Sequence, residues 1–400
     1  MAREIHCTRY SFSPAHSAFF LIVAKPVYRI FWAEMNSDLL YQLALTEVPT
    51  IGHVHAKNLI NFFGTAENIF KASVKDLISV DGIFPGHAKN IKQFRDFKSA
   101  ENELKFIQKY HIETLFISDK NYPRRLLNIY DPPALLFYRG NTDLNASRII
   151  AIVGTRSSTE YGKMLTDKLV QALQSYDVVI ISGLAFGIDA FAHKAAIKNN
   201  VPTVGVLAHG LDTIYPLEHS SLAKSMIKTG GLLTEFKINT TPDKHNFPSR
   251  NRIVAGMCDA VIVVETGAKG GSLITANLAN DYNRNVYAFP GRTTDAKSIG
   301  CNILIADNKA GLLTDPQHFI KEMGWDDDKL MKHKQPKQLF EDLDEQEKKI
   351  VDLLKANNPL HIDELMFQSG LTSSMTASVI LALELRSIIA TLPGKRLTLI

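Results

Sequence analysis

One short segment combines the two kinds of side chain that single-stranded nucleic acids require. The run DKHNFPSRNR, residues 243–252, contains Lys244, Arg250 and Arg252, with Phe247 among them. Lysine and arginine pair with phosphates, while an aromatic ring can stack on an exposed base. The alternative is that Phe247 belongs to the core and the arginines are solvated or paired with carboxylates. The local density of cations favours the binding interpretation.

Glycine turns that join a strand to a helix occur at three places in the chain. The segments are VGTRSSTEYG (153–162), SGLAFGIDAFAH (182–193) and ETGAKGGSLITA (265–276). Free amides at such a turn face an anion at the start of the following helix, and Arg156 would add a guanidinium fork. None of them has the GxGxxG spacing, so the dinucleotide fingerprint is absent. Three turns along one sheet edge predict an anion-binding crevice longer than one mononucleotide needs.

Asp189 and His193 are the one pair at these turns that suggests acid–base chemistry. They are four residues apart and therefore share a helical face. A structural role is more common for such a pair, with the Asp supporting the first helical turn and the His hydrogen-bonded to it. The structural role is the favoured interpretation.

Six short β-branched runs predict the strands that position these turns. They cover residues 148–154, 177–183, 201–210, 230–236, 259–267 and 285–291, with helical stretches such as 161–176 and 272–284 between them. Their continuous apolar character is typical of strands buried on both faces of a parallel sheet. The fold class is therefore α/β: a Rossmann-like, doubly wound, mostly parallel sheet that binds ligands at the carboxyl ends of its strands.

The sequence on either side of this sheet predicts two smaller domains. Residues 35–110 are short helices, and the segments 48–60 and 80–91 both place a glycine turn before Ala-Lys-Asn. This resembles a helix-hairpin-helix or SAM-like pattern. Such a module either contacts DNA phosphates or only packs as a small helical unit without a ligand. Phe84-Pro85 breaks the second copy of the pattern.

A charged linker is predicted at 313–342. After it, the sequence of residues 343–400 predicts three helices and a hairpin that turns at Pro393-Gly394, which together make a winged-helix-like domain.

Composition limits the classes of function. The 400 residues carry 45 Lys and Arg against 41 Asp and Glu, so any nucleic-acid surface must be a local concentration of cations. Three cysteines without a CxxC pair exclude a disulfide framework and a structural zinc site, which favours a reducing compartment. The longest apolar run, residues 18–24, is too short to span a membrane. We expect translation to start at Met35, with residues 1–34 an extension outside any domain.

Several long blocks of the chain resemble the DprA/Smf family, the DNA-processing protein A of natural transformation. The match is dense from 122 to 312, within a predicted domain at 111–312. It rests on YPRRLLNIYDPPALLFYRG (122–140), IAIVGTRSSTEYG (150–162), ISGLAFGIDAFAHKAA (181–196), GLDTIYP (210–216), NFPSRNRIVAG (246–256), GGSLITANLA (270–279) and AFPGRTTDAKSIGCNILI (288–305). The resemblance implies a cytoplasmic homodimer, with no enzymatic reaction and no cofactor, that binds single-stranded DNA, protects it and loads the RecA recombinase.

Carried over residue by residue, the resemblance implies a DNA pocket with no catalytic and no metal-binding residue. Its members would be Gly154, Thr155, Arg156, Lys244, Phe247, Arg250, Asn251, Arg252 and Lys269. Secondary anion contacts are expected at Ser182, Gly183, Gly270, Gly271 and Ser272. The family's usual Gly-Thr-Gly is Ala208-His209-Gly210 here, its Ser-Gly-Ser is Gly270-Gly271-Ser272, and Thr159 replaces a common Ser, which affects fine specificity more than binding.

An enzyme is the alternative interpretation. The predicted α/β domain also resembles Rossmann-like phosphoribohydrolases, whose Pro-Gly-Gly-x-Gly-Thr-x-x-Glu motif places an acid near the scissile bond. The corresponding stretch, residues 267–276, contains no carboxylate, although Asp189 and Glu265 remain as acids elsewhere. Release of a free base from a nucleotide would support the enzyme.

Overall fold

A computed structural model describes residues 38–325, 343–386 and 388–400. The chain divides into two compact units, the first ending at Leu104 and the second beginning at Lys105. The predicted extension 1–34, the predicted start at Met35 and residues 326–342 of the predicted linker lie outside the described residues.

The first unit is helical, as predicted. It contains a helix over residues 38–45, α2 (His53–Phe63), α3 (Ala66–Lys71), α4 (Val74–Ile78), α5 (Pro85–Gln93) and the start of α6 (Lys98–Tyr110). The two similar segments meet reciprocally: Asn58 donates to the Asp81 carbonyl and Asn90 to the Pro49 carbonyl, both at 3.1 Å. Pro85 occupies the first turn of α5, where its missing N–H is not needed, so Phe84-Pro85 begins a helix. A helix-hairpin-helix role in DNA binding stays a prediction.

The second unit is built on one sheet of nine strands in the order β1-β2-β6-β5-β4-β3-β7-β8-β9. The strands are β1 (Glu113–Phe116), β2 (Leu135–Gly140), β3 (Arg148–Val153), β4 (Val178–Ser182), β5 (Thr203–Val206), β6 (Gly231–Thr234), β7 (Ala260–Val263), β8 (Asn285–Ala288) and β9 (Gly311–Leu312). Strands β3 to β9 pair in parallel, which confirms the predicted doubly wound sheet.

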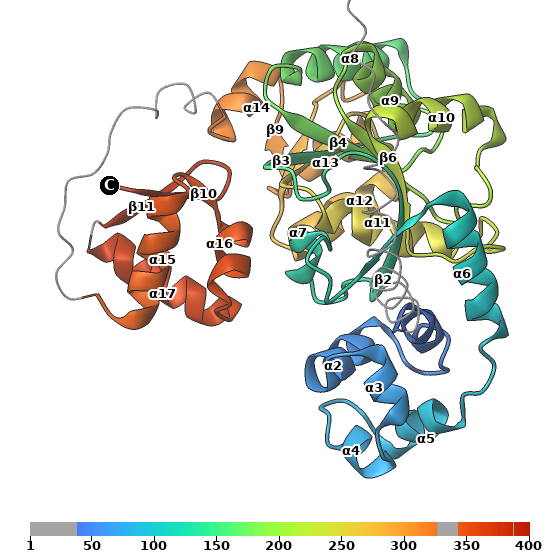
Figure 1. Ribbon diagram of the computed structural model, residues 1–400. Helices are drawn as coiled ribbons and strands as arrows, with labels where there is room; N and C mark the ends of the chain where they lie inside the picture. Colours follow the sequence, from blue (N-terminus) through green and yellow to red (C-terminus); the bar gives the residue numbers. More distant parts are fainter. Residues whose placement is uncertain (1–37, 326–342, 387) are drawn as a thin grey trace, which may run out of the picture. The chain divides into compact units, whose positions relative to one another are not determined.

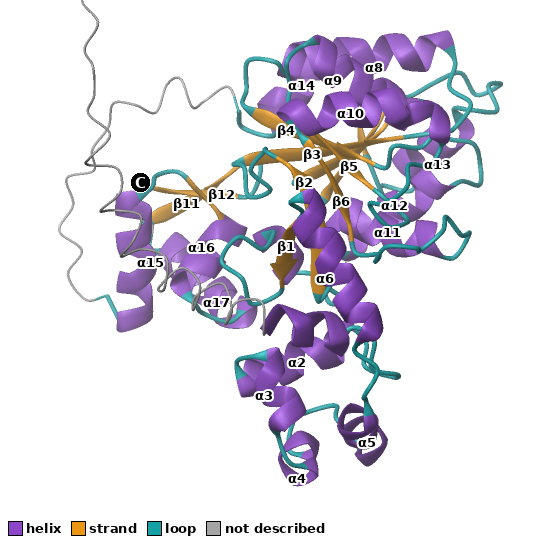
Figure 2. Ribbon diagram, turned by 45° about the vertical axis from the view of Figure 1, so that its right-hand side comes forward, coloured by secondary structure: helices purple, strands orange, loops and turns teal. Residues whose placement is uncertain are grey.

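Helices cover both faces of this sheet (Figure 2). On one face lie α8 (Glu160–Leu173), α9 (Ile188–Lys198), α10 (Ser220–Thr229) and α14 (Pro316–Glu322); on the other lie α11 (Asn246–Gly256) and α12 (Gly271–Asp281). The shorter helices α7 (Arg124–Leu127) and α13 (Ile299–Ala306) complete the domain. One hydrophobic core cluster packs Ile150, Ile180 and Ile262 of the central strands against Leu169 of α8 and Ala192 of α9.

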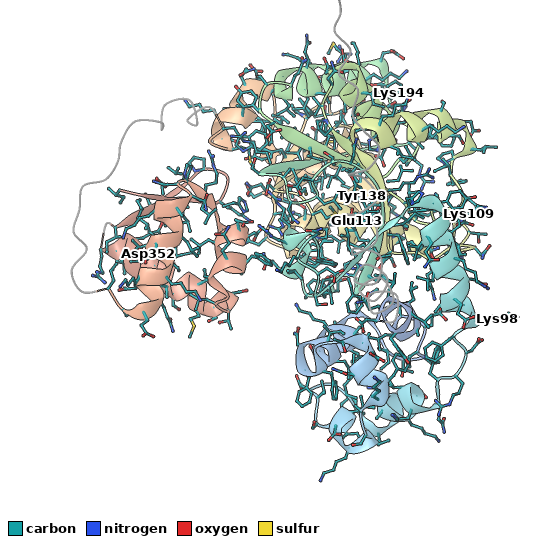
Figure 3. All side chains as sticks on the ribbon, in the orientation of Figure 1. Lys98, Lys109, Glu113, Tyr138, Lys194 and Asp352 are labelled. Atoms are coloured by element: carbon teal, nitrogen blue, oxygen red, sulfur yellow. The ribbon has the colours of Figure 1, made fainter. Side chains whose placement is uncertain are left out.

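Two antiparallel strands, β1 and β2, extend the sheet beyond the runs that the periodicity predicted. Glu113 and Tyr138 are register partners and lie next to each other in Figure 3. The Tyr138 hydroxyl donates to the Gly230 carbonyl at 3.1 Å, and β2 pairs with β6. The run LLFYRG has the composition of a strand, but it is stabilised as one by pairing with β1 and with β6, which is about ninety residues away.

The structure differs from the predicted linker over residues 313–325. Asp315 caps α14 by accepting from the Gln317 amide, with Pro316 in the first turn. Phe319 and Ile320 are fully buried in the same core as the central strands, and Met323 and Trp325 join them. The acidic run that begins at Asp326 follows this short helix directly, which is why the sequence pattern predicts a solvated linker here.

Residues 343–400 form the predicted winged-helix domain, at the red end of the chain in Figure 1. Its elements are α15 (Glu345–Ala356), β10 (Leu360–His361), α16 (Ile362–Ser369), α17 (Ser373–Leu385), β11 (Ile389–Leu392) and β12 (Arg396–Leu399). The hairpin of β11 and β12 turns at Pro393 to Lys395, with Gly394 at positive φ. In the part of the chain that is described, no single helix could cross a membrane; α16 and α17, a bent pair, reach the required length and apolarity only together.

Candidate nucleic-acid interface

A crevice of about 240 Å³ opens at the carboxyl ends of β3, β4 and β7. From β3 the chain order runs one way to β4 and the other way to β7, so the crevice lies at the topological switch point of the sheet, where α/β domains bind ligands. Residues of all three glycine turns line it, together with residues of α11. The predicted residues that line it are Gly154, Thr155, Arg156, Gly183, Phe247, Arg250, Asn251, Lys269, Gly270, Gly271 and Ser272.

The glycine turn at 153–162, which leads into α8, is held in place by Glu265, at the end of β7. The Thr155 amide donates to the Glu265 carbonyl at 2.7 Å, and the Thr159 amide donates to the Glu265 carboxylate at 2.9 Å. The Thr159 hydroxyl donates to the same carboxylate and accepts from the Gly162 amide at 3.1 Å. The amino terminus of α8 is therefore closed by the protein's own carboxylate, and an anion in the crevice must use other donors.

The start of α12 is the open helix terminus in the crevice. Its N-cap is Gly270, which supplies no side-chain cap, and its first turn contains no acidic residue. The Ser272 hydroxyl donates to Thr266, and the Asn251 amide group donates to the Gly271 carbonyl at 3.3 Å. Lys269 is exposed directly before this terminus and lines the crevice. Amide donors and a lysine at one helix start form a site suited to a phosphate.

Arg156 and Phe247 lie together at the mouth of the crevice. The Arg156 guanidinium carbon is 5.0 Å from the centre of the Phe247 ring, and the Phe247 ring is 6.3 Å from that of Tyr215. Phe247 is half-buried, so its ring retains a solvent-facing surface, and Arg156 is exposed. A smaller adjoining hollow is lined by Phe186, Tyr215 and Phe247. An aromatic surface beside a guanidinium is suited to one stacked base and its phosphate.

Arg250 forms the floor of the crevice. It is 5% exposed and donates from Nη1 to the carbonyls of Gly183 and Val206, and from Nε to the side chain of Asn251. A Cβ on Gly183 would lie 2.1 Å from Arg250 Nη1, so only glycine allows this approach. Burial lowers the pKa of Arg250, although the neighbouring Asp189 opposes the shift. Arg250 is therefore oriented mainly by the protein and presents a fixed positive charge beneath a ligand.

Three of the predicted contact residues do not line the crevice. Lys244 is exposed two residues before α11 begins. Arg252 is 7% exposed and pairs with the carboxylate of Glu235 and the carbonyl of Asp131. The Ser182 hydroxyl is fully buried and donates to the Ile152 carbonyl at 2.7 Å. The crevice thus brings together most of the predicted contact residues. Arg252 instead pairs with a carboxylate, as the alternative interpretation of residues 243–252 expected.

Asp189 and His193 do not pair with each other in the way that the favoured interpretation predicted. Asp189 lines the crevice and accepts from the Gly183 amide at 3.1 Å, and burial raises its pKa. His193 Nδ1 is 2.7 Å from the Thr203 hydroxyl, and burial lowers its pKa to about 3. His193 is therefore neutral at physiological pH, and both residues have structural roles, as that interpretation held.

Comparison with known proteins agrees with this geometry. The family model described as DNA recombination-mediator protein A matches residues 113–324, and the DprA winged helix domain matches residues 334–395. The chain belongs to the DprA/Smf family. It is 37% identical over 289 residues to Protein Smf of Synechocystis, which covers 70% of this chain and 72% of that protein. It is 43% identical over 224 residues to DNA processing protein DprA of Bacillus subtilis, 56% of this chain and 75% of that protein.

A solved DprA structure shares the fold. The X-ray structure of DNA processing protein A from Streptococcus pneumoniae aligns with 70% of this chain and 96% of its own, at a TM-score of 0.61 and 34% identity. The α/β domain and the winged-helix domain described here are thus those of DprA/Smf proteins.

Among the residues that the sequence did not single out are Thr266, which lines the crevice and receives the Ser272 hydrogen bond, and Tyr215, which lies beside Phe247 in the adjoining hollow. Tyr215 belongs to the block GLDTIYP. The aromatic residue in this turn was the signal in the sequence that could have identified it. Thr266 has no signal in the sequence, because its role depends on the packing of two turns.

Glu265→Ala tests whether the carboxylate positions the Arg156 turn. The substitution removes the acceptor of the Thr159 amide and hydroxyl, so we expect a loss of about 1–3 kcal/mol in the free energy of unfolding, measured by urea denaturation. The Glu265→Ala variant should also bind single-stranded DNA more weakly. Glu160→Ala is the matched control, because the Glu160 side chain is exposed and its ion-pair partner among the described residues is Lys163, three residues along the same helix. This substitution should change stability by less than about 0.5 kcal/mol. Equal stability of both variants would contradict the positioning role.

Proposed function

We propose that this protein binds single-stranded DNA in the crevice, protects incoming DNA and loads the RecA recombinase onto it during transformation or recombination. The observation that carries the DNA proposal is the juxtaposition of Arg156, Phe247 and Lys269 around one crevice with an open helix terminus. Groups that donate hydrogen bonds to phosphate, placed next to an exposed ring, bind the backbone of a nucleic-acid strand and one of its bases at the same time. The names of the relatives, DNA processing proteins, support the same class of substrate.

The partners and the location are proposed from the resemblance to the DprA/Smf family. We propose a cytoplasmic homodimer that hands DNA to RecA, without a cofactor. In α17, which would be the recognition helix of a winged helix, the exposed residues include Met375, Leu381 and Leu385, and its sequence SSMTASVILALEL contains no lysine or arginine. A DNA-reading helix needs cations at its surface, so we propose that this domain contacts protein.

The phosphoribohydrolase alternative is not favoured by the geometry. Asp189 is the one carboxylate among the described residues that line the crevice, and it accepts a backbone amide beside Arg250. The Glu265 carboxylate is engaged by Thr159 instead of facing the crevice. A hydrolase needs an acid free to reach the scissile bond. Incubation with nucleoside monophosphates is expected to release no base, and released base would support the enzyme.

Titration with single-stranded and duplex DNA of equal length tests the proposed function. Single strands should bind more tightly, because Phe247 can stack only on an exposed base. Affinity should fall with salt by about 0.7 log units per phosphate contact for each log unit of salt concentration. Fluorescence anisotropy over a salt series measures both quantities. Equal affinity for the two forms would reject the crevice as a single-strand site and direct attention to the helical unit before Leu104.

A further inference from the structure

Two exposed aromatic side chains adjoin the DNA crevice at the carboxyl ends of β4 and β5. They are Tyr215, which is 46% exposed, and Phe186, which is 42% exposed, and both line the hollow beside Phe247. Gly183 directly follows β4 and Leu207 directly follows β5, and these two residues line the same hollow. A single base stacked on Phe247 would leave both of the other rings uncovered.

The hollow continues directly from the crevice. The residues that line both are Arg156, Gly183, Ala185 and Phe247. Gly187, at positive φ, lets the loop that carries Phe186 pass against the Arg156 turn, since a Cβ there would lie 2.1 Å from the Thr155 carbonyl oxygen. Strands β7, β3, β4 and β5 are neighbours in the sheet, so the edge from β7 to β5 spans about 14 Å. A strand that passes from Lys269, after β7, over Phe247 therefore reaches this hollow next.

The rings of Tyr215 and Phe247 form two separate surfaces. Their centres are 6.3 Å apart and their planes are inclined by 51°. A planar base that lies flat on one ring therefore cannot lie flat on the other. The hollow between them has a volume of about 20 Å³, which is room for about one water molecule, so a base can cover it but cannot enter it. Two tilted rings can thus carry two bases, one on each.

The loop that carries Tyr215 is ordered by a buried histidine. The Tyr215 amide donates to His209 Nε2 at 3.2 Å, so Nδ1 holds the ring proton and donates to the Gly210 carbonyl at 2.9 Å. His209 is 1% exposed, and burial lowers its pKa, so the neutral ring with an acceptor at Nε2 predominates at physiological pH. The Gly210 amide donates to the Thr240 carbonyl at 3.2 Å. Tyr215 is therefore positioned before any ligand arrives, which lowers the entropic cost of binding.

We propose that Tyr215 stacks on a second base, the neighbour of the base on Phe247, with Arg156 at the phosphate between them. This inference rests on the proposed function, that the crevice binds single-stranded DNA. Arg156 lines both the crevice and the hollow, and its guanidinium carbon is 5.0 Å from the centre of the Phe247 ring. No carboxylate is among the described residues that line the hollow. The Phe186 ring, 5.1 Å from that of the buried His219, forms an apolar edge for the second base.

The test uses the full chain and two labelled oligonucleotides of about eight nucleotides. One has a single thymine among abasic positions, and the other has two adjacent thymines. Tyr215→Ala should bind the two-thymine probe about tenfold more weakly with an unchanged salt slope, and Tyr215→Phe should restore the affinity. Binding of the single-thymine probe should be nearly unchanged, because Phe247 still takes its base. Tyr130→Ala is the matched control: Tyr130 is exposed, its ring is 5.1 Å from that of Tyr282, and it lines neither the crevice nor the hollow.

The two probes distinguish a second base site from a support for Phe247. Equal weakening of both probes by Tyr215→Ala would mean that Tyr215 only supports the Phe247 ring, and it would overturn the proposal. An unchanged affinity for the two-thymine probe would also overturn it. If Tyr215→Ala does not fold, Tyr215→Leu removes the aromatic face while keeping an apolar side chain, and the same outcomes decide.

Arg156→Ala tests the proposed function separately, because it removes a phosphate contact and no ring. Weaker binding of both probes with a flatter salt slope would support the crevice as the DNA site. If Arg156→Ala weakens binding while Tyr215→Ala does not, the second base site fails and the proposed function stands. If Arg156→Ala changes neither probe, the crevice is not the DNA site, and the proposed function and the second base site fail together.

Discussion

Replacing Arg250 by methionine is expected to lower the free energy of unfolding by about 3–5 kcal/mol and to abolish DNA binding. The side chain is buried, and it satisfies the carbonyls of Gly183 and Val206 while facing the buried Asp189. Methionine has a similar length but leaves these acceptors without a donor and the carboxylate without its cation. Urea denaturation followed by circular dichroism measures the loss.

Lys244→Met is the matched control for this prediction. Lys244 is a cation six residues earlier, but it is exposed. Its replacement should change stability by less than about 0.5 kcal/mol. If Arg250→Met were as stable as the control while losing DNA affinity, Arg250 would be a direct phosphate contact and not the structural floor of the crevice.

Phe247→Ala is expected to weaken single-strand binding by about 1–3 kcal/mol, roughly 5- to 150-fold, and to leave the salt slope unchanged. The ring is half-buried beside Tyr215 and under Arg156, so its removal deletes a stacking surface and no charge. Arg156→Ala should also weaken binding, but it should flatten the slope by about 0.7 log units, the value of one phosphate contact. Anisotropy titrations over a salt series distinguish the two effects.

Phe247→Trp is the control that separates stacking from packing. A larger ring can carry the same base, so affinity should be mostly restored. A core phenylalanine would behave differently: Phe247→Ala would then cost about 3–5 kcal/mol of stability, and tryptophan would not fit the space. A collapsed melting temperature in Phe247→Ala, together with full-strength binding by Arg156→Ala, would remove the proposed site.

The central sheet could be predicted from sequence because strands buried on both faces need no information from their partners. Runs such as IIAIV (149–153) and VVII (178–181) are apolar throughout, and a glycine turn follows each strand. The two antiparallel strands were harder to predict, because β1 and β2 become strands only through pairing with each other and with β6. Helix α14 was missed because its buried Phe319 and Ile320, and the buried Met323 and Trp325 after it, directly precede a strongly charged run.

The sequence by itself determined the chemistry of the candidate site: which residues carry cations, where an aromatic ring lies among them, and where the chain turns on glycine before a helix. These properties are local, so they can be read from spacing. Only the tertiary structure decided which way each side chain faces. Arg250, Asn251 and Arg252 are consecutive, yet successive helical residues point about 100° apart, and each found a different partner: the carbonyls of Gly183 and Val206, the Gly271 carbonyl and the Glu235 carboxylate. Those partners lie far along the chain or on other elements, and no pattern within ten residues can specify them.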